Sequence, residues 1–84
     1  MNQQLIFNHD FVYNAEQDAV SFSCLLAGLR LTGYIARPVE VSAEVWLMQV
    51  KAAAFDWEEA VEQALANECW NEAGEFWLPA PVKY

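Results

Sequence analysis

Few residues in this sequence have the type and spacing that chemistry needs. A catalytic nucleophile requires a nearby base, and His9, the single histidine, is far in sequence from both Cys24 and Cys69. A zinc site requires about four ligands at recognisable spacing, which one histidine and two separated cysteines do not supply. The three glycines form no phosphate-binding loop. We therefore predict a non-enzymatic protein with no catalytic residue, no metal site and no cofactor.

Glu68 is the carboxylate with the most unusual predicted position. At helical spacing it aligns with an apolar stripe that begins at Trp57. One interpretation is that Glu68 lies near the helix end and reaches water or pairs with Arg30, Arg37 or Lys51. The other is a binding-site carboxylate in an aromatic pocket, which would make the protein a small-molecule binder around Glu68.

The length and composition predict one small acidic domain over residues 1–84. The chain is 56% hydrophobic and contains four tryptophans, enough apolar material for a core. Its net charge is −8 and its pI about 4.2, which disfavours direct contact with nucleic acid or with an anionic membrane surface.

The sequence also bears on the cellular compartment. Residues 1–4 lack the basic start and apolar run of a signal peptide, and no apolar run approaches the ~18 residues of a membrane helix. Cys24 falls on an apolar strand face, where a reduced cysteine behaves as a small hydrophobe. We predict a cytoplasmic protein.

The stretch Ala19–Ala36 predicts a β-hairpin that turns at Ala27–Gly28. A two-residue turn pairs Phe22 with Gly33 and gathers the apolar residues of both strands on one face. A shift of one residue would mix the two faces, so the pattern specifies the register.

The remaining segments predict one more strand before the hairpin and one at the end of the chain. Residues 5–7 form an apolar run, residues 8–10 a turn and residues 11–13 a further apolar run, which together with the hairpin favour a three-strand meander. Residues 75–78 predict a final strand, which Pro79 ends. We expect the tail, residues 80–84, to be loosely held.

Two helices are expected between the hairpin and the last strand. Ser42 is the predicted N-cap of the first helix, which runs to about Ala54. Asp56 is the predicted N-cap of the second, in a capping box with Glu59, and Gly74 lies near its end. Strands, then helices, then a strand predict an α+β fold with two helices packed on one face of a small antiparallel sheet.

Several of these segments together resemble a known family. They are Tyr13-Asn14, Ala19-Val20-Ser21-Phe22, Leu26-Ala27-Gly28-Leu29-Arg30-Leu31-Thr32, Phe55-Asp56-Trp57-Glu58-Glu59 and Gly74-Glu75-Phe76-Trp77-Leu78. Their spacing over residues 5–79 resembles the YrdB-like family of small bacterial proteins, a domain of unknown function. The resemblance implies no activity, cofactor or catalytic residue.

The distribution of apolar residues predicts a protein-interaction role. Val45 and Met48 lie largely on the side of the first helix opposite its core face, and Trp70 falls roughly opposite Trp57 on the second. Exposed apolar surface of this kind often marks an interface. We therefore expect a protein partner and self-association, most simply as a homodimer, through Val45, Met48 and Trp70.

The acidic residues leave an alternative open. Between Ala52 and Val82 the chain has seven acidic residues and no lysine or arginine. Glu58, Glu59 and Glu62 on the second helix would then present a negative face to a basic groove of a partner protein, as in inhibitors that imitate nucleic acid, including anti-CRISPR proteins.

Overall fold

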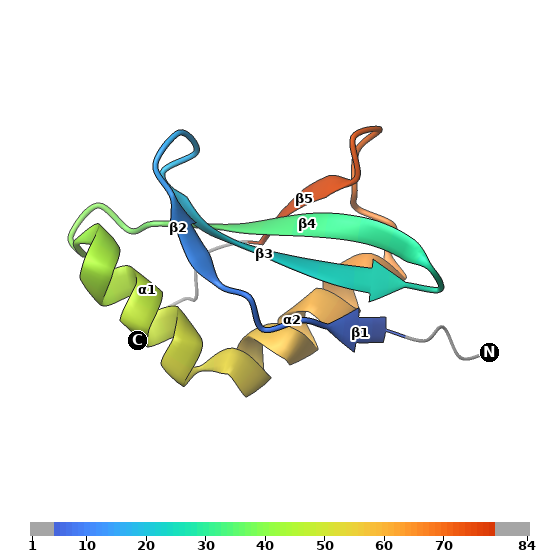
Figure 1. Ribbon diagram of the computed structural model, residues 1–84, viewed down its shortest axis with the longest axis horizontal. Helices are drawn as coiled ribbons and strands as arrows, with labels where there is room; N and C mark the ends of the chain where they lie inside the picture. Colours follow the sequence, from blue (N-terminus) through green and yellow to red (C-terminus); the bar gives the residue numbers. More distant parts are fainter. Residues whose placement is uncertain (1–4, 79–84) are drawn as a thin grey trace.

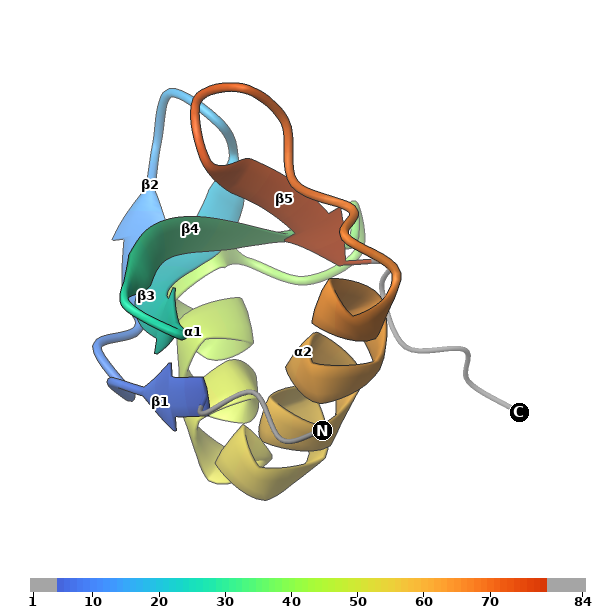
Figure 2. The same cartoon turned by 90° about the vertical axis from the view of Figure 1, so that its right-hand side faces the viewer.

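The computed structural model describes residues 5–78, which form a five-stranded sheet with two helices on one face (Figure 1). The elements, in chain order, are β1 (Leu5–Phe7), β2 (Val12–Asn14), β3 (Ala19–Leu26), β4 (Leu29–Ala36), α1 (Ala43–Ala52), α2 (Ala54–Ala66) and β5 (Glu75–Leu78). Viewed at right angles, the sheet forms one layer and both helices lie on the same side of it (Figure 2). The α+β prediction is confirmed, and the predicted loose tail lies outside the described residues.

The central hairpin has the predicted register, with Leu26 opposite Leu29 and Phe22 opposite Gly33. Ala27 and Gly28 both have positive φ, 53° and 87°, as expected for the hairpin turn whose twist matches that of the strands. A Cβ built on Gly33 would lie 2.2 Å from Cζ of Phe22. The Phe22 ring therefore packs directly over bare backbone, and Gly33 cannot carry a side chain without displacing it.

The predicted first strand of the meander is interrupted. β1 and β2 both pair antiparallel with β3, at its two ends, and residues 8–11 separate them. In this gap the Ser23 main-chain N–H donates to Oδ1 of Asp10 at 2.8 Å, and the Ser23 hydroxyl donates to Oδ2 at 2.6 Å. The Asn8 side-chain amide donates to the same hydroxyl at 2.8 Å. Side chains thus satisfy polar groups that a continuous strand would otherwise pair.

β5 differs from the expected arrangement, because it pairs with β4 in parallel, with Gly33 opposite Phe76 and Tyr34 opposite Trp77. The sheet is therefore mixed, in the order β1-β3-β4-β5 with β2 also on β3. The two helices supply the crossover that a parallel connection requires.

The core lies between the hairpin and the two helices. Trp46 and Val50 of α1 are buried, as are Trp57, Val61 and Leu65 of α2. The indoles of Trp46 and Trp57 meet edge to face, with centroids 6.4 Å apart. Phe7, Phe11, Phe22 and Phe76 complete an aromatic cluster beneath the sheet. In the described part of the chain, neither helix is long and apolar enough to span a membrane.

The helix starts differ in how they are capped. The Ser42 hydroxyl accepts from the Val45 N–H at 3.3 Å, which confirms Ser42 as the N-cap of α1. The prediction of Asp56 as the second N-cap is wrong, because α2 already begins at Ala54 and the Trp57 N–H donates to the Ala53 carbonyl. Ala53 ends α1 and begins α2, since its own N–H donates to Gln49 and Val50. Asp56 therefore lies within the first turn, where it interacts with the helix dipole alone.

Candidate functional site

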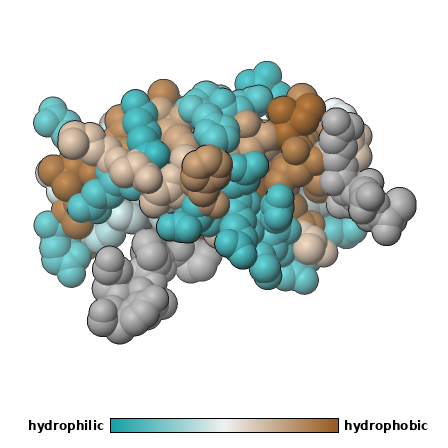
Figure 3. All heavy atoms as spheres, turned by 90° about the horizontal axis from the view of Figure 1, so that it is seen from below, coloured by the Kyte–Doolittle hydropathy of each residue, from teal (hydrophilic) through white to brown (hydrophobic). Residues whose placement is uncertain are grey.

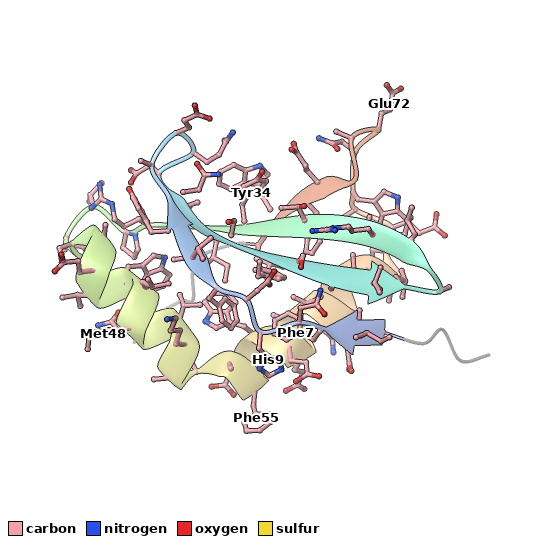
Figure 4. The ribbon with its side chains drawn as sticks, in the orientation of Figure 1. Phe7, His9, Tyr34, Met48, Phe55 and Glu72 are labelled. Atoms are coloured by element: carbon pink, nitrogen blue, oxygen red, sulfur yellow. The ribbon has the colours of Figure 1, made fainter. Side chains whose placement is uncertain are left out.

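The outward face of α1 is one of the apolar surfaces that the described part of the chain leaves open. Val45 is 45% exposed and Met48 is 68% exposed, while Trp46 and Val50 on the opposite side are buried. Seen from the helix side, the surface alternates between apolar and hydrophilic regions, with apolar colouring at the α1 end (Figure 3). Met48 points away from the sheet, as does Phe55 at the start of α2, which is 82% exposed (Figure 4). We call Val45, Met48 and the exposed Ala52 the α1 apolar face.

The charges of the two helices differ. α1 carries one acid, Glu44, and one base, Lys51, and both are exposed. α2 carries four acids and no base: Asp56, Glu58, Glu59 and Glu62. The α1 apolar face therefore lies on a helix without net charge in a chain whose net charge is −8.

Trp70 does not join this surface. α2 ends at Ala66, and the chain then turns through Glu68, whose φ is 53°. This turn directs Trp70 back to the core, against which it packs half-buried. α1 lies toward one end of the molecule and residues 67–74 toward the other (Figure 1). The predicted grouping of Trp70 with Val45 and Met48 is not found because it extrapolated helical geometry past the true helix end.

Glu68 also lies off the predicted stripe. Its N–H donates to the Leu65 carbonyl at 3.0 Å in the turn after α2, and its side chain is exposed. Since the helix ends two residues earlier, Glu68 does not share the buried side of Trp57, Val61 and Leu65. Its position matches the interpretation of a solvated carboxylate at a helix end.

The three glutamates of the predicted acidic face have different surroundings. Glu59 and Glu62 are exposed. Glu58 is partly buried, and its Oε1 lies 3.8 Å from Nε2 of His9. The His9 ring in turn packs edge-on against Phe7, with centroids 4.9 Å apart. Glu58 therefore faces the β1–β2 connection, and the open acidic surface belongs to Glu59 and Glu62.

The two thiols are free, but their environments differ. Cys24 is buried and Cys69 is exposed. Burial, reinforced by the negative charge of Asp10, raises the pKa of the Cys24 thiol to about 11. Cys24 is thus protonated at neutral pH and acts as a core residue. Within residues 5–78, no cluster of three or more histidine, cysteine or acidic side chains could hold a metal ion.

Sequence reasoning missed a polar cluster around Asp18. The Arg37 guanidinium donates from Nε to Oδ1 of Asp18 at 2.8 Å and from Nη2 to Oδ2 at 3.1 Å. The Tyr13 hydroxyl also donates to Asp18, and these hydrogen bonds, that of Arg37 first, lower the pKa of Asp18. Arg37 further donates to the Val41 carbonyl at 2.6 Å. The hairpin register could have revealed this pair, because it places Asp18 opposite Arg37.

A second feature lies on the sheet face that the helices leave uncovered. The rings of Tyr34 and Trp77 stack with centroids 4.9 Å apart, and Tyr34 stands above the sheet in Figure 4. The Tyr34 hydroxyl donates to Oε2 of Glu75 at 3.4 Å, and burial together with the Glu75 charge raises the pKa of Tyr34. This pairing depends on the parallel β4–β5 register, for which the sequence carries no local signal.

Comparison with known proteins supports the fold. No protein-family model matches the sequence, and no curated protein matches it. Among solved structures, the chain is similar to a protein of unknown function from the DUF1488 family of Shewanella loihica PV-4, with 23% sequence identity and a TM-score of 0.80. The match covers 95% of this chain and 97% of that chain. At this identity the likeness shows that the two chains share one α+β fold over nearly their whole lengths.

Proposed function

We propose that this protein is a non-enzymatic interaction protein that self-associates through the α1 apolar face. The observation that carries the proposal is the exposure of Val45 and Met48 on a helix without net charge, within a strongly acidic chain. Two copies with a charge of −8 repel each other at most orientations. The α1 apolar face is where they approach with little local repulsion and with apolar area to bury.

The sheet edges support a contact through α1 rather than through added strands. At β5, Asn71 occupies both main-chain groups of Glu75: its N–H donates to the Glu75 carbonyl, and its Oδ1 accepts from the Glu75 N–H, each at 2.9 Å. At the other edge, β1 and β2 are three residues each and are separated by a gap. Short edge strands, of which β5 also has its first residue occupied, are poor templates for pairing with another strand.

The state of the nucleophilic side chains supports a non-enzymatic role. The Cys24 thiol is buried with a pKa of about 11, so it is not activated. The Ser23 hydroxyl is held by Asp10 and Asn8 inside the sheet edge. As part of the same proposal, we place the protein in the bacterial cytoplasm, which the free thiols of Cys24 and Cys69 support.

Light scattering at micromolar protein concentration tests the proposal. We expect a concentration-dependent mass above the 9.6 kDa of one chain. Met48→Glu should return the protein to one chain, because it places a carboxylate in the centre of the contact. Gln17→Glu, at an exposed position in the β2–β3 turn, adds the same charge away from α1 and is the matched control. A mass of 9.6 kDa at every concentration would contradict the proposal.

A second candidate function rests on the exposed acids of α2. Glu59 and Glu62 are exposed on a helix without a basic residue, so this surface could bind a basic groove of a nucleic-acid-binding protein in place of nucleic acid. Binding would then weaken strongly with added salt. The double variant Glu59→Lys/Glu62→Lys should abolish it without unfolding the protein, whereas Glu16→Lys, in the β2–β3 turn, should not. Binding that is unaffected by the double variant would reject this candidate.

A further inference from the structure

We infer that two copies meet α1 against α1, antiparallel, about a two-fold axis near Met48, with Glu44 of each copy paired to Lys51 of the other. This inference rests on the proposed self-association and specifies the surface and the residues that set its orientation. The partner is thus a second copy of this chain, and the interface uses the same surface on both copies.

The spacing of the two charges supports this arrangement. Glu44 and Lys51 are seven residues apart, which is close to two turns of an α-helix, so they lie on the same flank of α1. At 1.5 Å per residue they are separated by about 10.5 Å along the helix axis. Met48 lies near the midpoint of this interval, and on the adjacent outward side of the helix. The α1 apolar face is therefore bordered by one acid and one base, placed almost symmetrically about Met48.

A two-fold axis through that midpoint makes the charges of the two α1 helices complementary. In an antiparallel pair this axis places Glu44 of one copy opposite Lys51 of the other, on the same flank. The symmetry repeats the contact, so the interface has two such ion pairs. In a parallel pair the two-fold axis runs along the helices and places this flank of the two copies on opposite sides of the contact, so Glu44 and Lys51 form no ion pair across it. The charge pattern of α1 thus favours the antiparallel orientation, while Val45 and Met48 supply the apolar contact.

The acids of α2 restrict the contact to α1. α2 leaves the direction of α1 after Ala53 (Figure 1), and it carries Asp56, Glu59 and Glu62 without a compensating base. An interface that continued along α2 would therefore bring like charges together. A contact made by one helix of about 15 Å is small, so we expect a weak dimer that does not grow into larger assemblies.

Crosslinking through engineered cysteines tests the orientation. In a Cys69→Ser background, which leaves Cys24 buried, we expect Met48→Cys to crosslink with itself through a short bis-maleimide reagent. We expect Glu44→Cys and Lys51→Cys to crosslink when mixed, and each alone to give little dimer. Efficient crosslinking of Ala52→Cys with itself would indicate a parallel pair, in which equivalent positions of the α1 apolar face meet, and would overturn the inference.

Charge reversal provides an independent test in solution. Glu44→Lys makes the net charge less negative and would strengthen association if only net charge mattered. We expect instead a dimer dissociation constant about fivefold higher, because two ion pairs become like-charge contacts. The double variant Glu44→Lys/Lys51→Glu should restore the wild-type value. No weakening by Glu44→Lys would overturn the inference.

The results separate this inference from the proposal on which it rests. A single-chain mass at all concentrations rejects both. Self-association that is lost in Met48→Glu but is indifferent to Glu44→Lys keeps the proposed function and rejects the antiparallel arrangement.

Discussion

Asp10 acts as the missing partner of β3 where the edge strand is interrupted. Burial alone would raise its pKa, but the hydrogen bonds from the Ser23 hydroxyl and N–H outweigh this effect, so the pKa lies below its usual value of 3.8. A carboxylate whose pKa is lower in the folded than in the unfolded protein stabilises the fold above its unfolded pKa.

Replacing Asp10 should therefore destabilise the protein in a pH-dependent way. We expect Asp10→Ala to lower the free energy of unfolding by about 1–2 kcal/mol at pH 7, since charged hydrogen bonds to a buried serine are lost. The difference in the free energy of unfolding between the variant and the wild type should persist above about pH 4. It should shrink as the pH falls through the lowered pKa of Asp10. Urea unfolding measured across this range checks the prediction, with the exposed Glu16→Ala as control. A difference that does not vary with pH would exclude the carboxylate as the cause.

Gly33 allows the Phe22 ring to pack directly against the backbone of β4. Gly33→Ala should lower the free energy of unfolding by about 1–3 kcal/mol, because its Cβ would overlap the Phe22 ring. In the Phe22→Leu background, which removes the ring, the same substitution should cost less. A double-mutant cycle by urea unfolding measures this coupling, and additive effects would show that the close approach carries no energy.

The two helices form one element with a corner, and their caps are unequal. Ser42 caps α1 through its side chain, whereas Asp56 makes no capping bond at the start of α2. The sequence favoured Asp56 because it is followed by Glu59 in a capping-box pattern. In the structure α2 begins at Ala54, three residues before Trp57, and Trp57 and Val61 are buried in the core.

Because only Ser42 caps a helix through its side chain, we expect replacing Ser42 to destabilise the protein more than replacing Asp56. Ser42→Ala should lower the free energy of unfolding by about 1 kcal/mol. Asp56→Asn should cost less, about 0.3–0.5 kcal/mol, since it removes a dipole interaction alone. Thermal and urea unfolding of both variants test this order, and an equal or larger loss for Asp56→Asn would argue for a true cap.

For the whole molecule, net charge opposes the proposed association. The repulsion between two copies with a charge of −8 acts over long distances, and salt screens it within about 10 Å at 0.1 M. Apolar contact between the α1 faces is not screened.

We therefore expect self-association to strengthen as NaCl rises from about 10 to 150 mM. Sedimentation equilibrium over this range measures the effect, and Glu16→Gln, which removes only one of the negative charges that make up the net charge of −8, should shift the curve only slightly. Dissociation on adding salt would indicate an interface held mainly by ion pairs.

The sequence determined the features that depend on neighbouring residues. Alternation along Ala19–Ala36 specified the hairpin register, because one shift would expose the apolar face. Ser42 specified the start of α1, and the helical spacing placed Met48 outside and Trp46 inside. These outcomes follow from periods of two and 3.6 residues, which act over short stretches of chain.

Tertiary structure decided the features that join distant segments. The parallel pairing of β5 with β4 follows from the path of the chain through both helices, and it brings Trp77 onto Tyr34. The interruption between β1 and β2 depends on Asp10 reaching Ser23, thirteen residues away. The positions of Glu68 and Trp70 depend on where α2 ends, and no strong stop signal marks Ala66 in the sequence. Such contacts are selected by the packing of the complete fold, so local periodicity does not reveal them.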